Sequence, residues 1–244
     1  MRWGRVEFEG KACFGTIAGE EMLVHDGDMF AGNRPTGQKI PLSGAKWLTP
    51  CRPSKMLALW NNFHAAAAKN GWAIPAEPLY FAKTPNSFAP HGSEVRAPAR
   101  YDGRVVYEGE LGVVIGRDGK IFGYCCVNDL TALDLIGKDP NFMQGVRAKS
   151  FDGFGVFGPV IATDLDPMAL TVKTLVNGRE RQNYPISDAI FSPAQLVELI
   201  SREISLEPGD VIACGTSLGV LPMRGETGVE IVIDGIGTLS TIFR

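Results

Sequence analysis

Two glutamates stand two positions apart in the segment Tyr107–Gly116, where they could hold a cation together. The valine and isoleucine run that follows them predicts a buried strand, and residues two apart on a strand point to the same face. Glu108 and Glu110 therefore share one small volume, and both stay ionised in a partly dry site only if a cation or a shared proton compensates them. The alternative is that the pair marks the solvated face of an edge strand.

Asp129 is the candidate for a third carboxylate. It follows the run Gly123–Val127, which is typical of a strand interior. A hard dication takes oxygen ligands, about six in the case of Mg²⁺, so a carboxylate from a second strand would suit it. The three acids together predict a site for such an ion.

The composition predicts a β-rich chain outside the classes that bind nucleic acid or membranes. The 244 residues are 45% hydrophobic and include 29 glycines and 16 prolines, which favours many short strands joined by turns. The formal charge is −3 and lysine and arginine form no cluster, which argues against nucleic acid or a membrane surface as a partner. No apolar run approaches the roughly 20 residues of a membrane helix, so we expect a cytoplasmic protein.

The five cysteines predict neither a disulfide framework nor a zinc site. Their number is odd and no two of them form a C-x-x-C pair. We expect them to be small core residues, Cys125 and Cys126 among them.

The elements that would position these side chains fall into two predicted domains. Residues 1–50 contain short alternating segments between glycine turns and predict a small β domain, and residues 51–244 form the main body. In the main body we expect helices over 62–71 and 192–204, and strands over 55–60, 78–83, 160–162, 170–176, 211–216, 228–233 and 237–243. His64 then lies just past a strand end, and Lys149 begins a glycine-rich segment typical of a loop that lines a site.

An ordered set of motifs in this chain resembles the fumarylacetoacetate hydrolase family. The set covers most of residues 50–244, and residues 1–50 resemble the small N-terminal extension of some members. The matching pieces are Glu108-x-Glu110-Leu111 with Val113–Gly116, Gly123-Tyr124, Asn128-Asp129-x-Thr131-Ala132-x-Asp134, Lys149–Asp152, Gly158-Pro159, Val176–Gly178, and Leu206–Asp210 with Gly215-Thr216.

The resemblance implies a mostly β (α+β) fold, a β-sandwich roll that forms a homodimer. It implies Mg²⁺ or Mn²⁺ held by Glu108, Glu110 and Asp129, and small-molecule 2-oxo acid substrates, often β-diketo acids from aromatic ring breakdown. The remaining residues with implied roles are catalytic Lys149 and His64, and substrate-binding Lys83, Gly215 and Thr216.

The chain departs from the family pattern at positions that bear on the reaction. Hydrolytic members pair the histidine of the short helix with a glutamate three residues later, and here that position is Ala67. Without the carboxylate His64 lacks its orienting partner, which leaves either a lid residue near the substrate or a helix residue without chemistry. Leu133 stands where arginine is common, and Ser217 replaces a proline.

From these observations we expect a metal-dependent enzyme that stabilises the enolate of a 2-oxo or β-diketo (di)carboxylate in aromatic catabolism. C–C bond hydrolysis is the first expectation. A keto–enol isomerase or a decarboxylase of the 5-carboxymethyl-2-hydroxymuconate type is the alternative, because neither needs an activated water. A catalytically silent homologue that binds metal and a 2-oxo acid is a third hypothesis.

Overall fold

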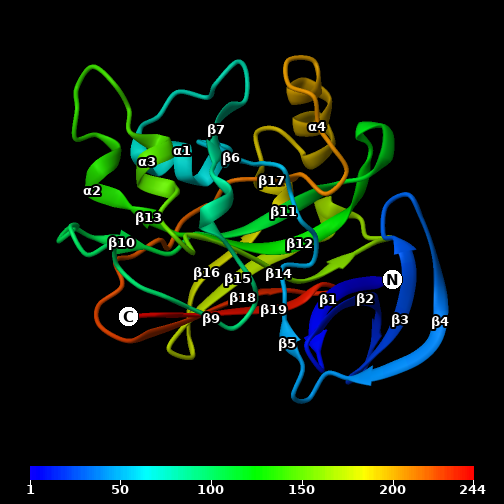
Figure 1. The fold of residues 1–244 in the computed structure, drawn as a ribbon. Helices are drawn as coiled ribbons and strands as arrows, with labels where there is room; N and C mark the ends of the chain where they lie inside the picture. The colour runs from blue at the N-terminus through cyan, green and yellow to red at the C-terminus, as the bar shows by residue number, and fades with distance from the viewer.

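The computed structural model describes residues 1–244 and confirms the predicted fold class, because strands dominate and helices are few and short (Figure 1). A large sheet holds twelve strands. In spatial order they are β4 (Gly32–Pro41), β3 (Glu21–Asp28), β2 (Lys11–Ala18), β1 (Arg2–Phe8), β14 (Gly155–Ala162), β12 (Ile121–Asp129), β11 (Gly109–Ile115), β17 (Val211–Ala213), β6 (Met56–Trp60) and β7 (Leu79–Lys83), with β5 (Lys46–Trp47) beside β1 and β8 (Phe88–Ala89) beside β14.

Two smaller sheets complete the β structure. The five-stranded sheet has the order β16 (Arg179–Pro185), β15 (Thr171–Val176), β18 (Thr227–Ile233), β19 (Gly237–Phe243) and β9 (Ser93–Val95), and the third sheet pairs β10 (Val105–Val106) with β13 (Thr131–Ala132). The helices are α1 (His64–Asn70), α2 (Leu133–Ile136), α3 (Gly145–Lys149) and α4 (Pro193–Ser201), with single 3₁₀ turns η1 (Pro85–Ser87), η2 (Arg117–Gly119), η3 (Pro167–Ala169) and η4 (Ile186–Asp188).

Strands β11 and β12 form the middle of a sandwich and are buried on both faces. Leu111 and Val113 belong to the core shared with the five-stranded sheet, whereas Val114 and Val127 belong to a second core on the opposite face. Strands buried on both sides are hydrophobic at successive positions, as the run Val113–Ile115 is. The even-numbered glutamates of this segment therefore point away from the five-stranded sheet.

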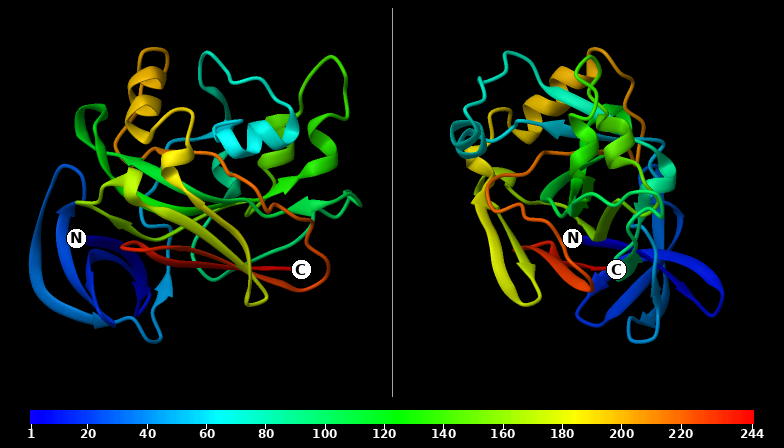
Figure 2. Two further views of the ribbon diagram at one scale, coloured as in Figure 1. Left: turned by 180° about the vertical axis from the view of Figure 1, so that it is seen from behind. Right: turned by 90° about the vertical axis from the view of Figure 1, so that its left-hand side faces the viewer.

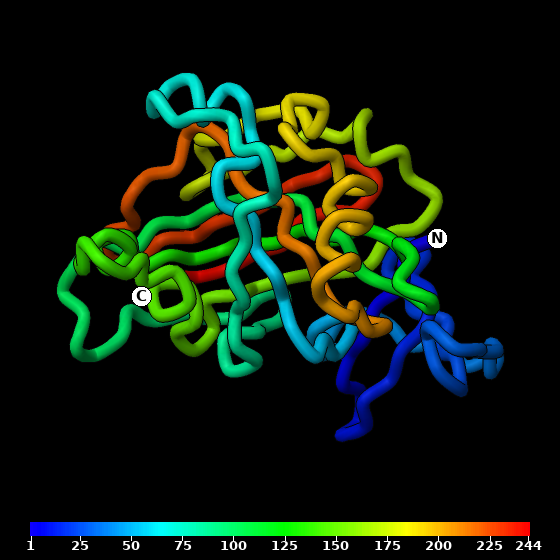
Figure 3. Tube along the Cα trace, turned by 90° about the horizontal axis from the view of Figure 1, so that it is seen from above, coloured from blue at the N-terminus to red at the C-terminus, as the bar shows by residue number.

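The large sheet curls, which brings its far end over its middle. Seen from above, β6 and β7 cross over the green strands β11 and β12 (Figure 3). At the other end, β1 to β4 extend away from the helices (Figure 2). Strand β1 pairs with β14, so one sheet runs across the boundary predicted at residue 50, and the independence of residues 1–50 remains a prediction.

Several predicted elements are found, and some short ones were not anticipated. Helix α4 begins after Ser192, which forms a capping box with Gln195. Strand β4 was missed, and Lys149 ends the short helix α3 instead of opening a loop. Helices of four or five residues are too short for a 3.6-residue period to show in the sequence, and tertiary packing decides them. The cysteines are all free and four are buried, and no helix has both the length and the apolar character to cross a membrane.

Asp210 joins the starts of β6 and β17. Its carboxylate, 1% exposed, accepts hydrogen bonds from the N–H and hydroxyl of Ser54, from the N–H of Lys55 and Glu207, and from Lys55 Nζ at 2.5 Å. Burial acts to raise the pKa of Asp210, but these donors outweigh it and leave the pKa below its ordinary value. Strands β6 and β17 pair in parallel directly after this junction, with Met56 opposite Val211.

Replacing Asp210 with alanine should lower the free energy of unfolding by about 3 kcal/mol at neutral pH, because five donors lose their acceptor. Urea denaturation measures this loss, with the exposed Asp234→Ala as the control. The folded pKa is depressed, so the stabilisation is present above the unfolded pKa of about 3.9 and is lost as the pH falls through the folded pKa. A difference from the wild type that persists unchanged in acid would contradict this assignment.

Candidate metal and substrate site

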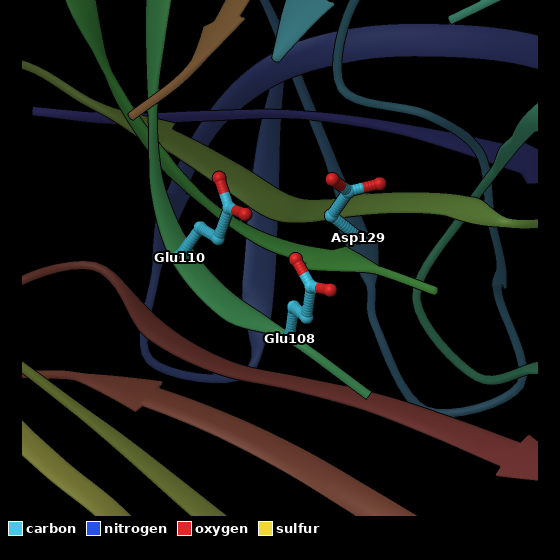
Figure 4. Close-up of side chains that lie close together, drawn as sticks. All are labelled: Glu108, Glu110 and Asp129. Carbon is cyan, nitrogen blue, oxygen red and sulfur yellow. The ribbon is translucent and has the colours of Figure 1, made fainter. Parts of the chain in front are cut away.

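The pairing of β11 with β12 brings three carboxylates to one face of the large sheet. Glu110 lies opposite Val127, and Asp129 donates its N–H to the carbonyl of Glu108 across 2.9 Å. Side chains at facing or alternate positions of an antiparallel pair share a face. One oxygen from each of Glu108, Glu110 and Asp129 lies within 4.8 Å of the others, and the three side chains converge in Figure 4.

Two lysines reach the same carboxylates from other elements. Lys149, at the end of α3, places Nζ 2.6 Å from Glu108 Oε2 and 2.6 Å from Asp129 Oδ2. Lys83, the last residue of β7, places Nζ 2.5 Å from Asp129 Oδ1 and also donates to the carbonyl of Lys149. With all five groups ionised, three carboxylates and two ammonium groups give this cluster one net negative charge, and burial beside these charges raises the pKa of Glu110.

Burial and mutual charge shift the pKa values of the cluster in opposite directions. Burial, together with the neighbouring charge of Asp129, raises the pKa of Glu110 well above its ordinary range. Burial also acts against the charge of Asp129, but Lys149 and Lys83 outweigh it and lower its pKa. Burial acts to lower the pKa of Lys149, but the surrounding carboxylates outweigh this effect. The pKa of Lys149 is therefore raised, and the side chain stays an ammonium.

One oxygen of Glu110 identifies where a cation would fit. Glu110 is fully buried, and its Oε2 accepts the N–H of Gly215 at 2.7 Å, but its Oε1 has no hydrogen-bond partner. A buried carboxylate oxygen without a partner is costly. A dication beside the three acids would satisfy that oxygen and compensate the excess negative charge, so the donor set fits a hard divalent metal.

The peptide groups of Gly109, between the two glutamates, are held by Thr216 and by side chains that no sequence motif marked. Gln182 on β16 accepts the N–H of Gly109 at 3.0 Å and donates to Thr216 Oγ1 at 2.8 Å. The carbonyl of Gly109 accepts hydroxyl hydrogens from Tyr184 at 2.6 Å and Thr216 at 3.0 Å. Thr174 completes the set by donating to Gln182 Oε1 at 2.8 Å. We call Gln182, Tyr184, Thr216 and Thr174 the Gly109 clamp.

The clamp explains why glycine separates the two glutamates. A Cβ at position 109 would lie 2.1 Å from Thr174 Oγ1 and 2.8 Å from Ile231 Cδ1, both in the five-stranded sheet. The buried Gln182 and Tyr184 alternate with more exposed residues along β16, which is the signal that could have identified them.

His64 and Ala67, both on helix α1, have surroundings different from those of the charged cluster. His64 begins α1 with an exposed ring that forms no hydrogen bond. Ala67 is fully buried, and Asp188 accepts the N–H of Ala65 at 3.0 Å at the start of the helix. The structure thus brings together Glu108, Glu110, Asp129, Lys149 and Lys83, with Gly215 and Thr216 bonded to the Glu110 carboxylate and the Gly109 peptide. The part that His64 plays remains a prediction.

Comparison with protein-family models matches both parts of the chain. Residues 55–244 match the model described as fumarylacetoacetate (FAA) hydrolase C-terminal. Residues 1–50 match the model described as Rv2993c-like, N-terminal.

Individual relatives share the sequence and the fold. An uncharacterised protein of Archaeoglobus fulgidus is 40% identical over 90% of this chain and 86% of its own length. The oxaloacetate tautomerase YisK of Bacillus subtilis is 38% identical over 78% of this chain and 69% of its own length. The crystal structure of 5-carboxymethyl-2-hydroxymuconate delta-isomerase from Mycobacterium smegmatis is 34% identical, with a TM-score of 0.90 over 100% of this chain and 99% of the isomerase chain.

Adding Mg²⁺ or Mn²⁺ should raise the melting temperature, because an ion that binds only the folded state stabilises it. A concentration of 100 times Kd corresponds to about 2.7 kcal/mol, or about 5–10 °C for a chain of this size. Glu110→Gln should remove the shift, and the exposed Glu230→Gln should keep it. A wild-type melting curve that does not respond to either ion would contradict the metal assignment.

Replacing Gln182 with methionine should weaken Mn²⁺ binding by about tenfold, because residues that orient metal ligands contribute on this scale. Isothermal titration calorimetry measures the affinity, with the exposed Gln38→Met as the control. If Gln182→Met lowers only the melting temperature and leaves Mn²⁺ affinity intact, the Gly109 clamp supports the sandwich and not the ligands.

Proposed function

The chain belongs to the fumarylacetoacetate hydrolase family, and from that membership we propose that it is a divalent-metal-dependent enzyme that interconverts the keto and enol forms of a 2-oxo acid. The observation that carries the proposal is the buried group of three carboxylates and two lysines with one unpartnered oxygen on Glu110. A dication held by Glu108, Glu110 and Asp129 would supply a Lewis acid for the negative charge that develops on the 2-oxo oxygen.

Lys149 and Lys83 are positive charges whose positions the fold already fixes. Lys149 remains an ammonium whose Nζ is fixed between two carboxylates, so it needs little reorganisation to stabilise an anion beside them. Lys83 braces this arrangement from β7, where it bonds both Asp129 and the Lys149 carbonyl. Thr216 and the N–H of Gly215 hold the opposite side of the site through Gly109 and Glu110.

The surroundings of His64 favour proton transfer over C–C hydrolysis, which reverses the order expected from the sequence. Hydrolysis needs a base that activates water, and the exposed ring of His64 has no carboxylate bonded to it. Tautomerisation needs no activated water: a base takes a proton from the carbon beside the 2-oxo group, and a proton is delivered to the 2-oxo oxygen. The names of YisK and of the M. smegmatis isomerase describe reactions of this kind.

Several finer points remain our predictions. They are the choice of Mg²⁺ or Mn²⁺, a substrate from aromatic catabolism, a homodimer, a cytoplasmic location and a proton-transfer role for His64. C–C hydrolysis, decarboxylation and a silent homologue are the competing outcomes that the next experiment separates.

Incubating the protein with a 2-oxo acid and Mg²⁺ in D₂O should speed deuterium incorporation at the carbon beside the 2-oxo group, as followed by proton NMR and product mass. Lys149→Met should slow this exchange by about a hundredfold, because it removes a preoriented charge. The exposed Lys120→Met serves as the control.

The products decide between the alternatives. Two acids formed with the addition of water would indicate hydrolysis, and loss of CO₂ would indicate decarboxylation. If oxalate binds in the presence of Mg²⁺ but no substrate exchanges or breaks down, the chain is a silent homologue.

A further inference from the structure

An apolar pocket of about 420 Å³ lies between β7 and the start of α3. None of its eight lining residues is charged, and its largest apolar members are Trp60, Leu79, Phe81, Met143 and Val146. The hydroxyl of Tyr80, the one polar group among their side chains besides the Trp60 indole, donates to Glu203 at 2.8 Å. The pocket therefore offers few polar partners to anything that enters it.

Phe81 forms a wall shared by this pocket and the charged cluster. Phe81 and Lys83 are two apart on β7 and point to the same face. The ring centroid of Phe81 lies 5.5 Å from Lys149 Nζ, which itself contacts Glu108 and Asp129. A Cβ at Gly145 would lie 3.7 Å from Phe81 Cγ, so α3 begins against the same ring. The pocket is thus one aromatic ring away from the lysine that holds the carboxylates.

Three apolar side chains that line the pocket are exposed to solvent. Leu79 is 45% exposed, Met143 is 55% exposed and Val146 is 47% exposed. An apolar group lodged between them would remove this surface from water, and each buried methylene favours binding by about fourfold.

The charges of the cluster limit what else the ligand can carry. Three carboxylates, two lysines and a dication have a net charge of plus one, which matches a single carboxylate on the ligand. A second carboxylate in the pocket would lose hydration without meeting a cation. Arg100, Lys138 and Arg147 line a separate hollow of about 360 Å³ together with Asp102 and Asp134, and no cationic side chain lines the apolar pocket itself.

We propose that the pocket lined by Phe81, Leu79, Met143 and Val146 receives an alkyl or aryl substituent of the ligand, so that the substrate is a 2-oxo monocarboxylate with an apolar tail. The inference rests on the proposed function, because it assumes that the 2-oxo carboxylate end lies at the metal. Within that function it selects 2-oxo monocarboxylates as the substrate class and excludes 2-oxo dicarboxylates.

Isothermal titration of the Mg²⁺-loaded protein with pyruvate, 2-oxohexanoate, 2-oxooctanoate and 2-oxoglutarate tests the proposal without requiring turnover. We expect 2-oxooctanoate to bind at least tenfold more tightly than pyruvate, and 2-oxoglutarate to gain nothing over pyruvate. Oxalate, which has no tail, is the reference for binding at the metal itself.

Leu79→Asp and Met143→Asp should each remove most of the gain from the longer tail and leave oxalate affinity unchanged. Met168→Asp is the matched control, since Met168 is an exposed methionine on η3 and is not among the residues that line the pocket. Circular dichroism confirms that each variant is folded, and Leu79→Ala is the milder replacement if Leu79→Asp is not.

Two different failures can be told apart. If oxalate and pyruvate bind but tail length makes no difference, or if 2-oxoglutarate binds most tightly, the pocket does not select the substrate and the proposed function stands. If neither oxalate nor any 2-oxo acid binds with Mg²⁺, both the proposed function and this inference are overturned.

Discussion

The burial of three carboxylates against two lysines is the interaction on which the rest of this structure depends. In a medium of low dielectric such charges are tolerated only with partners at hydrogen-bond distance, and here each lysine contacts Asp129. With all its groups ionised the cluster has one more negative than positive charge. Glu110 Oε1, which has no hydrogen-bond partner, lies where that charge is uncompensated. The fold holds this excess negative charge in a defined place, where a cation would be compensated by the three carboxylates.

The sandwich supports this cluster from the opposite face of the same strand. Gly109 presents its two peptide groups to Gln182, Tyr184 and Thr216, while the flanking glutamates point the other way. Because Thr174 occupies the space that a side chain at position 109 would need, the two sheets approach closely at this point. The packing of the two sheets at Gly109 therefore also fixes the direction in which Glu108 and Glu110 point.

A common site with variable surroundings explains how one family hosts several reactions. A dication held by the carboxylates, together with Lys149, would favour negative charge on a 2-oxo group, and isomerisation, decarboxylation and C–C cleavage would all share this step. Helix α1 carries Ala67 at the position where the family resemblance predicts a glutamate in hydrolytic members. The apolar pocket is lined by Leu79 at the start of β7 and by Met143 in the segment that joins α2 to α3.

The sequence by itself determined the parts of the site that depend on local periodicity. Alternation along one strand placed Glu108 and Glu110 on one face, and the ordered motifs added Asp129, Lys149 and the family. Asp134, the last residue of the Asn128-Asp129 motif, accepts hydrogen bonds from the N–H and Nε of Arg104.

Only the tertiary structure decided which distant side chains contact one another in the site. Lys83, which the family resemblance implied for substrate binding, contacts Asp129 across 46 positions because the large sheet curls. Gln182 contacts Gly109 across 73 positions because the second sheet packs behind it. The physical reason is that the spacing between residues indicates only which face of their own strand or helix they share. Which other element covers that face follows from how the sheets curl and pack, and no local pattern records it.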